Sequence, residues 1–371
     1  MNKIQFHPPL ADAKSFPKPI INGLAAFKWL SLTPFKRKKA IFSGHYLFTL
    51  NGRNALALLA EKLALKSTET ILLPAYHCPA LVEPFIWQGV NIEFYHLNAD
   101  LSVDLTDLAS KINNTTRACL FVRYFGFELN IKAATALAKK QELTVIEDWA
   151  HCFFGSIGEA DNGLVADFAI SSCNKFFPTL DGGIIHAKKP LNFVLSKQPI
   201  KEEIKYFLHL HPHLCNFLST IKNIVLPNAI AENNNEIPAF RYFNHQTKNI
   251  NCCWFTQCFV KQSHHQKIIQ ARRQNYLYLL QNLIDLSVGK PLYPILPDAT
   301  VPYVFPFVLS SKAYFKPIRQ AAITIFRWEE LVSTDCQTSQ TYHQRLIQIP
   351  CHQSLTQKNL NYIINTIKNL T

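Results

Sequence analysis

The sequence predicts an α/β protein whose larger part holds a mainly parallel sheet and whose smaller C-terminal part is α+β. Between residues 70 and 148, short apolar runs rich in β-branched residues alternate with helical patterns of about ten residues, as in chains of parallel strands with helical crossovers. The run 143–148 ends abruptly in acid, which is typical of a buried parallel strand that reaches the polar carboxyl edge of its sheet. Beyond Lys189 the pattern changes to longer helices and fewer strands. These three observations carry the prediction of the fold.

The elements of the larger part follow in order. Strands are expected at 70–75, 91–97, 118–124, 143–148 and 166–172, and helices at 79–87, 104–112 and 131–140. A helix at 55–63 precedes them, and because it is apolar on more than one face we expect it to be buried. No GxGxxG follows the first strand, which argues against a nicotinamide-binding domain.

The remaining segments complete the predicted organisation. Residues 1–43 are expected to form either an arm over the surface that touches a second subunit or a loosely ordered tail. Residues 44–235 are expected to form the large domain and 236–371 the small one. Residues 201–231 have a broken helical pattern, and the polar stretch 232–238 is expected to be a loop between domains. The small domain is predicted to hold a long helix from residue 268, strands at 301–309 and 321–326, and an amphipathic helix at 354–370.

Composition limits the classes of function. A chain of 371 residues with 48% hydrophobic residues is a globular protein long enough for two ordinary cores. The formal charge of +13 favours anionic partners, such as nucleotide-linked substrates. No zinc-finger or RNA-binding signature accompanies this charge, so we expect no nucleic-acid partner.

The sequence also indicates a compartment. The amino terminus lacks the pattern of a signal peptide, and Asn22 and Lys28 interrupt the apolar stretch 20–32, so no membrane span is expected. Ten cysteines without regular spacing are typical of the reduced thiols of a cytosolic protein. Cys252, Cys253 and Cys258 lie near histidines but lack CxxC pairing, so we expect a cytoplasmic protein without a metal site.

Three reactive side chains follow the ends of predicted strands. Asp148 and His151 follow one strand, and Lys175 follows the next, at the edge where open α/β sheets bind ligands. A lysine amine condenses with the aldehyde of pyridoxal phosphate (PLP) and moves protons, and a carboxylate keeps the pyridine nitrogen protonated. A histidine can hydrogen-bond the phenolic oxygen or pack against the ring. A single lysine here is usually solvated and a single aspartate usually caps a helix, but both segments together favour a PLP site.

These residues resemble a known family, the sugar-nucleotide aminotransferases of the DegT/DnrJ/StrS type. The resemblance rests on Asp148-Trp149-Ala150-His151 and on Lys175 followed by Asp181-Gly182-Gly183. Further similar segments are Leu73-Pro74-Ala75-Tyr76-His77-Cys78-Pro79, Tyr124-Phe125-Gly126, Pro306-Phe307 and the stretch 346–355. It implies a large PLP-binding domain with a mainly parallel seven-stranded sheet, covered by a smaller C-terminal α+β domain.

The resemblance also implies cofactor contacts. Lys175 would be the catalytic lysine, Asp148 would hold the pyridinium and His151 would orient the ring. The helix start at Gly52 would bind the phosphate, mainly through backbone N–H groups, because Arg53 and Asn54 replace the hydroxyl that the family usually has there. The remaining predicted contacts are Tyr76 or His77, one of which stacks on the cofactor, Ser172, and Asn244 reaching the neighbouring subunit.

The implied activity is transfer of an amino group from an amino acid, with glutamate the expected donor, to a nucleotide-linked keto sugar by a homodimer. Two alternatives stay open. A PLP-dependent sugar dehydratase is ranked lower because such relatives replace the lysine with histidine. A PLP-fold protein that binds or regulates without turnover is favoured by the altered phosphate loop. Polysaccharide or antibiotic-sugar biosynthesis is the usual setting of the family.

Overall fold

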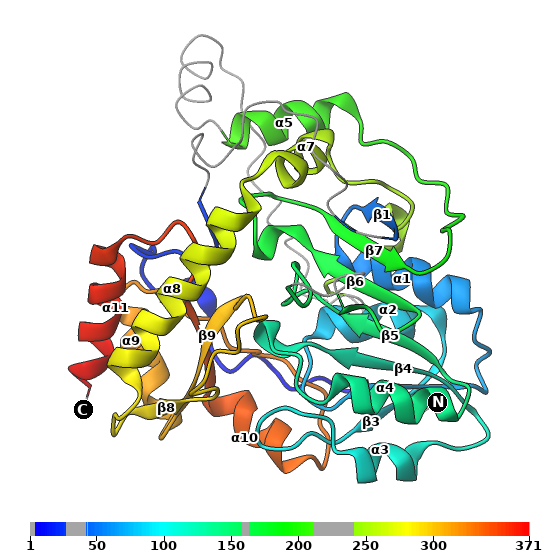
Figure 1. Ribbon diagram of the computed structural model, residues 1–371, viewed down its shortest axis with the longest axis horizontal. Coiled ribbons are helices and arrows are strands. Elements are labelled where there is room, and N and C mark those ends of the chain that lie inside the picture. The colour runs from blue at the N-terminus through cyan, green and yellow to red at the C-terminus, as the bar shows by residue number, and fades with distance from the viewer. Residues whose placement is uncertain (1–3, 27–41, 43, 158–162, 211–240, 371) are drawn as a thin grey trace.

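The computed structural model describes residues 4–26, 42, 44–157, 163–210 and 241–370 (Figure 1). A seven-stranded sheet with the order β1-β7-β6-β5-β4-β2-β3 dominates the larger part. Neighbouring strands from β3 to β6 run parallel, and β7 runs antiparallel to both β6 and β1. The predicted mainly parallel seven-stranded sheet is therefore confirmed. Its strands are His45–Thr49 (β1), Thr70–Pro74 (β2), Asn91–Tyr95 (β3), Thr116–Val122 (β4), Thr144–Asp148 (β5), Phe168–Ser172 (β6) and Gly183–Ala187 (β7).

Helices cover this sheet as the alternating pattern predicts. Helix α1 (Gly52–Leu63) packs against α2 (Pro79–Gln88), β6 and β7, whereas α4 (Ile131–Lys140) packs against α3 (Leu105–Lys111), β4 and β5. All seven residues from Asn54 to Ala60 are buried, which confirms the buried helix expected at 55–63. The burial fixes the start of α1 against the carboxyl end of β6.

A close backbone approach at Gly183 sets the position of this helix start. A Cβ on Gly183 would lie 2.3 Å from the carbonyl carbon of Asn51, so only glycine fits there. The preceding Gly182 has φ +106 and lies against Cys173 and Thr256. The Gly-Gly turn therefore allows β7 to begin directly beside the residue that caps α1.

The C-terminal part, at the left of Figure 1, is built on a three-stranded antiparallel sheet of the order β10-β9-β8. Its strands are Gly289–Pro291 (β8), Val304–Leu309 (β9) and Leu346–Pro350 (β10), and its helices are His265–Leu283 (α8), Phe315–Gln320 (α9) and Gln357–Lys368 (α11). This arrangement agrees with the α+β domain expected there. It confirms the long helix near residue 268, the strand within 301–309 and the closing amphipathic helix.

The strand predicted at 321–326 is wrong. Helix α9 ends at Gln320 and Ala322 has φ +58, a left-handed turn that an extended strand cannot contain. Only isolated bridges follow, one from Ile323 to Ile21 and one from Phe326 to Gln348. The strand that pairs with β9 on this side of the sheet is β10.

The N-terminal arm lies on this C-terminal part of its own chain. Phe6 bridges to Val332, Ile21 bridges to Ile323, and the His352 ring hydrogen-bonds the Asn22 carbonyl at 2.9 Å. A short 3-10 turn, η1 (Ala13–Ser15), interrupts it. The contact with a second subunit stays a prediction, because one chain is described.

Helices α5 (Ile200–Leu210) and α7 (Trp254–Gln262) pack together at the end of the large sheet near β1 and β7 (Figure 1). The helical pattern predicted from residue 201 is confirmed as far as Leu210. The rest of that pattern, the loop 232–238 and the domain boundary at 235 lie outside the described residues.

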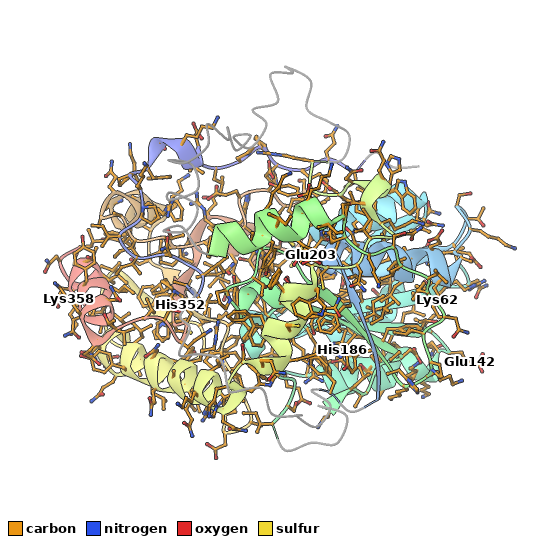
Figure 2. All side chains as sticks on the ribbon, turned by 90° about the horizontal axis from the view of Figure 1, so that it is seen from above. Lys62, Glu142, His186, Glu203, His352 and Lys358 are labelled. Atoms are coloured by element: carbon orange, nitrogen blue, oxygen red, sulfur yellow. The ribbon has the colours of Figure 1, made fainter. Side chains whose placement is uncertain are left out.

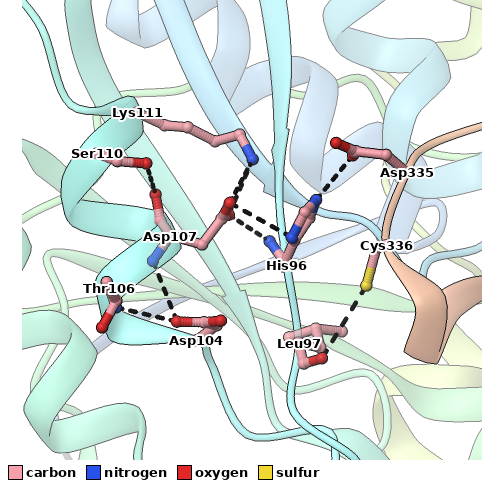
Figure 3. A network of polar contacts seen from close by, with 9 residues as sticks. All are labelled: His96, Leu97, Asp104, Thr106, Asp107, Ser110, Lys111, Asp335 and Cys336. Atoms are coloured by element: carbon pink, nitrogen blue, oxygen red, sulfur yellow. Dashed lines mark hydrogen bonds and ion pairs between the residues drawn. The ribbon is translucent and has the colours of Figure 1, made fainter.

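A polar network joins the C-terminal part to the outer edge of the large sheet (Figure 3). The His96 ring, just after β3, contacts Asp107 of α3 at 3.4 Å and Asp335 at 2.7 Å. The neighbouring Cys336 contacts the Leu97 carbonyl at 4.0 Å and begins α10 (Gln337–Arg345). These contacts fix the approach of the C-terminal part toward the ends of the parallel strands.

Charged side chains lie at the surface of the molecule, and buried polar ones lie inside (Figure 2). Lys62, Glu142 and Lys358 project at the periphery, whereas His186 lies inside, with its Nε2 2.8 Å from the Ser171 hydroxyl. All nine cysteines within the described ranges are free. No group of metal-ligating side chains gathers among these residues.

In the parts of the chain that the structure describes, no helix combines the length and apolar character needed to cross a bilayer.

Candidate functional site

A cavity of about 190 Å³ lies at the carboxyl ends of β5 and β6. The starts of α1 and α2 form one side of it, and the residues that follow β5 and β6 form the other. Parallel strands place their carboxyl ends at one edge, which is why side chains from segments far apart in the sequence meet here.

Asp148 and Lys175 both line this cavity. Asp148 is the last residue of β5 and is 8% exposed, and its Oδ1 accepts a hydrogen bond of 2.7 Å from the Ala150 N–H. Lys175 ends the 3-10 turn η5 (Cys173–Lys175) that follows β6. The two side chains that the sequence predicted to converge therefore share one cavity.

Burial and mutual attraction set the protonation of this pair. Burial raises the pKa of Asp148, while the Ala150 N–H and the Lys175 ammonium act in the opposite direction. Burial lowers the pKa of Lys175, while Cys78 and Asp148 oppose that shift. A lysine whose pKa is lowered exchanges its proton more readily near neutral pH, as a catalytic amine requires.

An aromatic wall stands beside the lysine. The Lys175 Nζ lies 5.3 Å from the centre of the Tyr303 ring, and that ring stacks on His151 at 4.7 Å. His151 stacks on Phe125 at 5.4 Å as well, and its Nδ1 accepts from the Phe125 N–H at 3.4 Å. Burial and the nearby Lys175 lower the pKa of His151 well below its usual value, so the imidazole is neutral. His151 lies behind the cavity lining and supports Tyr303 from there.

The opposite end of the cavity favours an anion. Gly52 and Arg53 open α1, where unpaired backbone N–H groups and the helix dipole attract negative charge. The half-buried Arg53 guanidinium makes no hydrogen bond or ion pair with another residue of the described chain. Burial lowers the pKa of Arg53, and Cys78, Glu83 and Tyr242 oppose that shift. A half-buried cation at a helix start is a suitable partner for a phosphate.

Gly52 leaves this end of the cavity open. A Cβ at Gly52 would meet Ile170 at 3.8 Å and Ser172 at 4.0 Å, which are ordinary contact distances. Ser172 lines the cavity, and its hydroxyl donates to Asn174 Oδ1 at 2.9 Å. Asn174 lines the cavity as well, so two polar side chains from the end of β6 face this region.

Besides His151, three predicted contacts of the large domain lie outside the cavity lining. The buried Asn54 side chain donates to the Thr247 carbonyl at 2.6 Å and ties α1 to that loop. His77 is fully buried between the Pro74 carbonyl at 2.9 Å and the Val332 N–H at 3.4 Å. Tyr76 is fully buried against Trp328, with ring centres 4.3 Å apart.

Asn244 has a local role in this chain. It is exposed, and its Oδ1 accepts from the Gln246 N–H at 3.0 Å at the start of the turn η6 (His245–Thr247). Its contact with another subunit stays a prediction.

Several residues of the lining were not predicted from the sequence, and the polar side chains of Cys78 and Asn174 are among them. Cys78, rather than Tyr76 or His77, reaches the cavity from the start of α2, and Asn174 reaches it from η5. The proline at position 79 was the available signal, because proline favours the first position of a helix and Cys78 directly precedes it. The arrangement thus combines the Lys175 amine, the Asp148 carboxylate and an anion cradle, formed by Gly52 and Arg53 at the start of α1, within one small cavity.

Part of the chain is similar in sequence to known aminotransferases. Residues 35–192 match the model described as the DegT/DnrJ/EryC1/StrS aminotransferase family. A dTDP-4-dehydro-2,3,6-trideoxy-D-glucose 4-aminotransferase of Saccharopolyspora spinosa is 26% identical over 198 residues, covering 50% of this chain and 51% of that protein. A GDP-perosamine synthase of Escherichia coli O157:H7 is 28% identical over 138 residues, covering 36% of this chain and 38% of that protein. The matches thus span about half or less of these relatives.

Solved structures share the fold over nearly the whole chain. PseC of Helicobacter pylori, an aminotransferase of pseudaminic acid biosynthesis, superimposes with a TM-score of 0.65 at 16% identity and covers 88% of this chain and 87% of its own. DesV of S. venezuelae gives a TM-score of 0.63 at 15% identity, with 89% and 85% covered. At such identities the likeness establishes the α/β fold with its smaller C-terminal part.

Proposed function

We propose that this chain, which belongs through residues 35–192 to the DegT/DnrJ/EryC1/StrS aminotransferase family, is a PLP-dependent aminotransferase. The amino group would move from an amino acid, glutamate, to a keto sugar linked to a nucleotide. The observation that carries the proposal is the shared cavity of Lys175, Asp148 and Arg53. An amine, a carboxylate and a cationic anion cradle are the three groups that PLP needs for its aldehyde, ring nitrogen and phosphate.

The residues present fit the cofactor. The Arg53 guanidinium makes no hydrogen bond or ion pair with a described residue, and the space above Gly52 is one that a Cβ would enter. We assign the phosphate to Gly52, Arg53 and Ser172, the ring nitrogen to Asp148 and the aldehyde to Lys175. Cys78, which lines the same cavity, is assigned to a face of the ring in place of Tyr76 or His77.

When bound, PLP supplies an aldehyde that condenses with amines and a pyridinium ring that withdraws electrons from them. The residues of the chain supply the proton transfers and the orientation. The Lys175 Nζ, whose pKa burial lowers, accepts the proton that leaves the α-carbon of the amino acid and then returns a proton to the acceptor. The ionised Asp148 stabilises positive charge on the ring nitrogen, and His151 holds Tyr303 beside the lysine.

The substrate class rests on relatives and on charge. The names of the two relatives above refer to sugars carried by dTDP and GDP, which are anionic. A net charge of +13 raises the local concentration of such anions near the protein. A nucleotide-linked keto sugar is therefore the acceptor that we propose.

The test is an amino-transfer assay with purified protein, PLP, glutamate and a panel of nucleotide-linked keto sugars. We expect release of 2-oxoglutarate that depends on one of the sugars and disappears in Lys175→Ala. Binding of PLP without transfer to any sugar would favour the binding or regulatory role instead. A dehydrated sugar formed without 2-oxoglutarate would favour the dehydratase.

We also propose that the protein is a homodimer, with Asn244 directed toward the cavity of the partner. Support comes from the exposure of Asn244 at the start of the turn 245–247. Light scattering tests the assembly, and a monomeric mass at working concentration would contradict it.

A further inference from the structure

A buried arginine of the C-terminal part contacts the backbone of the proposed active site without lining its cavity. Arg272 lies in the first half of α8 and is fully buried. It does not line the cavity, and nothing in the proposed proton transfers uses it. Its guanidinium nevertheless reaches the backbone of the residue that carries the amine.

Every hydrogen-bond acceptor of Arg272 is uncharged. Nη2 donates to the Lys175 carbonyl at 3.0 Å, Nη1 donates to the Tyr303 carbonyl at 2.8 Å and the Pro302 carbonyl at 3.3 Å, and Nε donates to Gln353 Oε1 at 2.9 Å. No carboxylate of the described chain pairs with it. The guanidinium thus links the turn at Lys175 to Tyr303, the residue before β9.

A second side chain holds the next peptide of the same turn. Gln353 Nε2 donates to the Phe176 carbonyl at 2.7 Å, and the Phe176 ring packs under the guanidinium with its centre 4.5 Å away. Arg272 and Gln353 therefore bind two successive carbonyls, those of Lys175 and Phe176. They approach from α8 and from the segment after β10.

Stability alone does not account for this arginine. A buried charge without a carboxylate is costly to desolvate, and a well-packed apolar side chain of similar volume avoids that cost. Burial lowers the pKa of Arg272 to about 10, so the group stays protonated at neutral pH. A directional, charged fork is what its three backbone acceptors require.

We propose that Arg272 is a positioning residue: by holding the carbonyls of Lys175 and Tyr303, it keeps the lysine amine inside the cavity, between the Tyr303 ring and Asp148. The inference rests on the proposed function for the role of Lys175 and extends it to the C-terminal part. The catalytic amine is then placed by two parts of the chain that meet only in the fold.

Four side chains face the Lys175 amine, and none of them is substituted in the variants described below. They are Cys78 from the start of α2, Asp148 from the end of β5, His151 after β5, and the Tyr303 ring before β9. None of them donates to or accepts from the Arg272 guanidinium through its side chain. Arg272→Lys also keeps the positive charge, so a shift of the Lys175 profile in that variant reports on the position of the amine, whereas in Arg272→Met the loss of a nearby cation contributes as well.

The experiment measures the amine directly, without cofactor. Full-length protein freed of PLP is treated with trace acetic anhydride across a pH series, and the acetylation rate of Lys175 is read by peptide mass spectrometry. The variants are Arg272→Lys, Arg272→Met and Gln353→Leu. Arg273→Met is the matched control, since Arg273 is the next residue of α8 and donates to the Pro297 carbonyl at 2.7 Å and the Thr300 carbonyl at 2.6 Å, away from Lys175.

We expect the midpoint of the Lys175 profile to rise toward the ordinary lysine value of about 10.4 in the Arg272 variants and to stay in place in Arg273→Met. With PLP and substrates, kcat should fall by roughly 10²-fold with little change in KM. Arg272→Lys keeps the charge, so it carries the test if Arg272→Met does not fold.

An unchanged midpoint in the folded Arg272 variants would overturn the positioning role while leaving the proposed activity untouched. Conversely, a wild-type protein that takes up no PLP would end the proposed function, whereas the acetylation profiles would still report whether Arg272 holds Lys175.

Discussion

Lys175 and Asp148 line the same cavity, although 27 positions separate them in the chain and they follow different strands, β6 and β5. Each affects the protonation of the other: the ammonium lowers the pKa of the carboxyl, and the carboxylate raises that of the amine, against the opposite effects of burial. This relationship is the physical basis of the proposed chemistry.

Removal of the amine should abolish transfer. Lys175→Ala is expected to lower kcat by roughly 10²- to 10⁴-fold or more, because the proton transfers lose their base. The control is Lys188→Ala, because Lys188 is exposed and its Nζ donates to the Val165 carbonyl. Release of 2-oxoglutarate is the measurement, and a Lys175→Ala protein with wild-type turnover would exclude this lysine as the base.

Neutralising the carboxylate should impair turnover more than binding. Asp148→Asn keeps an oxygen for the Ala150 N–H but removes the charge, so kcat should fall by about 10²-fold while PLP still binds. Since the active form is ionised and burial raises its pKa, wild-type activity should fall as pH decreases through a value above about 3.9. The pH profile of kcat tests this, and an identical acidic limb in Asp148→Asn would assign that limb to another group.

The anion cradle should recognise the phosphate and not the ring. Arg53→Met is expected to raise the Kd of PLP by roughly 10-fold or more, because charge-assisted hydrogen bonds to the phosphate are lost. Pyridoxal, which lacks the phosphate, should bind both proteins equally. Fluorescence titration with the two ligands measures the difference, and an equal loss for both would place Arg53 elsewhere.

Substitution by alanine should have different effects at two glycines near the cavity, Gly183 and Gly52. Gly183→Ala should lower the free energy of unfolding by about 1–3 kcal/mol, because the added Cβ would lie 2.3 Å from Asn51. Gly52→Ala meets no atom closer than 3.8 Å and should fold normally, yet bind PLP more weakly. Denaturant unfolding and PLP titration separate the two effects; a strongly destabilised Gly52→Ala would show that this space is not reserved for a ligand.

In the cofactor-free protein, the Lys175 ammonium should lower the free energy of unfolding. Lys175→Met is expected to raise the free energy of unfolding at neutral pH by roughly 0.5–2 kcal/mol, because it removes a buried ammonium. Since the folded pKa of Lys175 is lowered, the unfolded chain binds the extra proton, and the gain should shrink as pH rises from the folded pKa to about 10.4. Urea unfolding between pH 7 and pH 11 measures it; a gain that grows with pH would contradict the assigned shift.

The parallel sheet and the meeting of Asp148 and Lys175 could be predicted from the sequence, because both depend on local patterns. A run of apolar residues that ends in a polar group marks a buried strand and its carboxyl edge without any tertiary information. Once two such strands are neighbours, their final residues must lie together.

Contacts that depend on side-chain direction could not be predicted. Whether Tyr76, His77 or Cys78 reaches the cavity is decided by the turn between β2 and α2, which directs the first two into the core. The strand expected at 321–326 failed because Ile323 pairs with the N-terminal arm, more than 300 residues away along the sequence. Arg272 showed only helical spacing, and its contact with Lys175 exists only in the folded chain.

The most direct test of the account is to load the protein with PLP, reduce it with sodium borohydride and map the modified residue by peptide mass spectrometry. We expect one cofactor-modified peptide, the one that contains Lys175, and none in Lys175→Ala. A modification at another lysine, or no modification at saturating PLP, would contradict it.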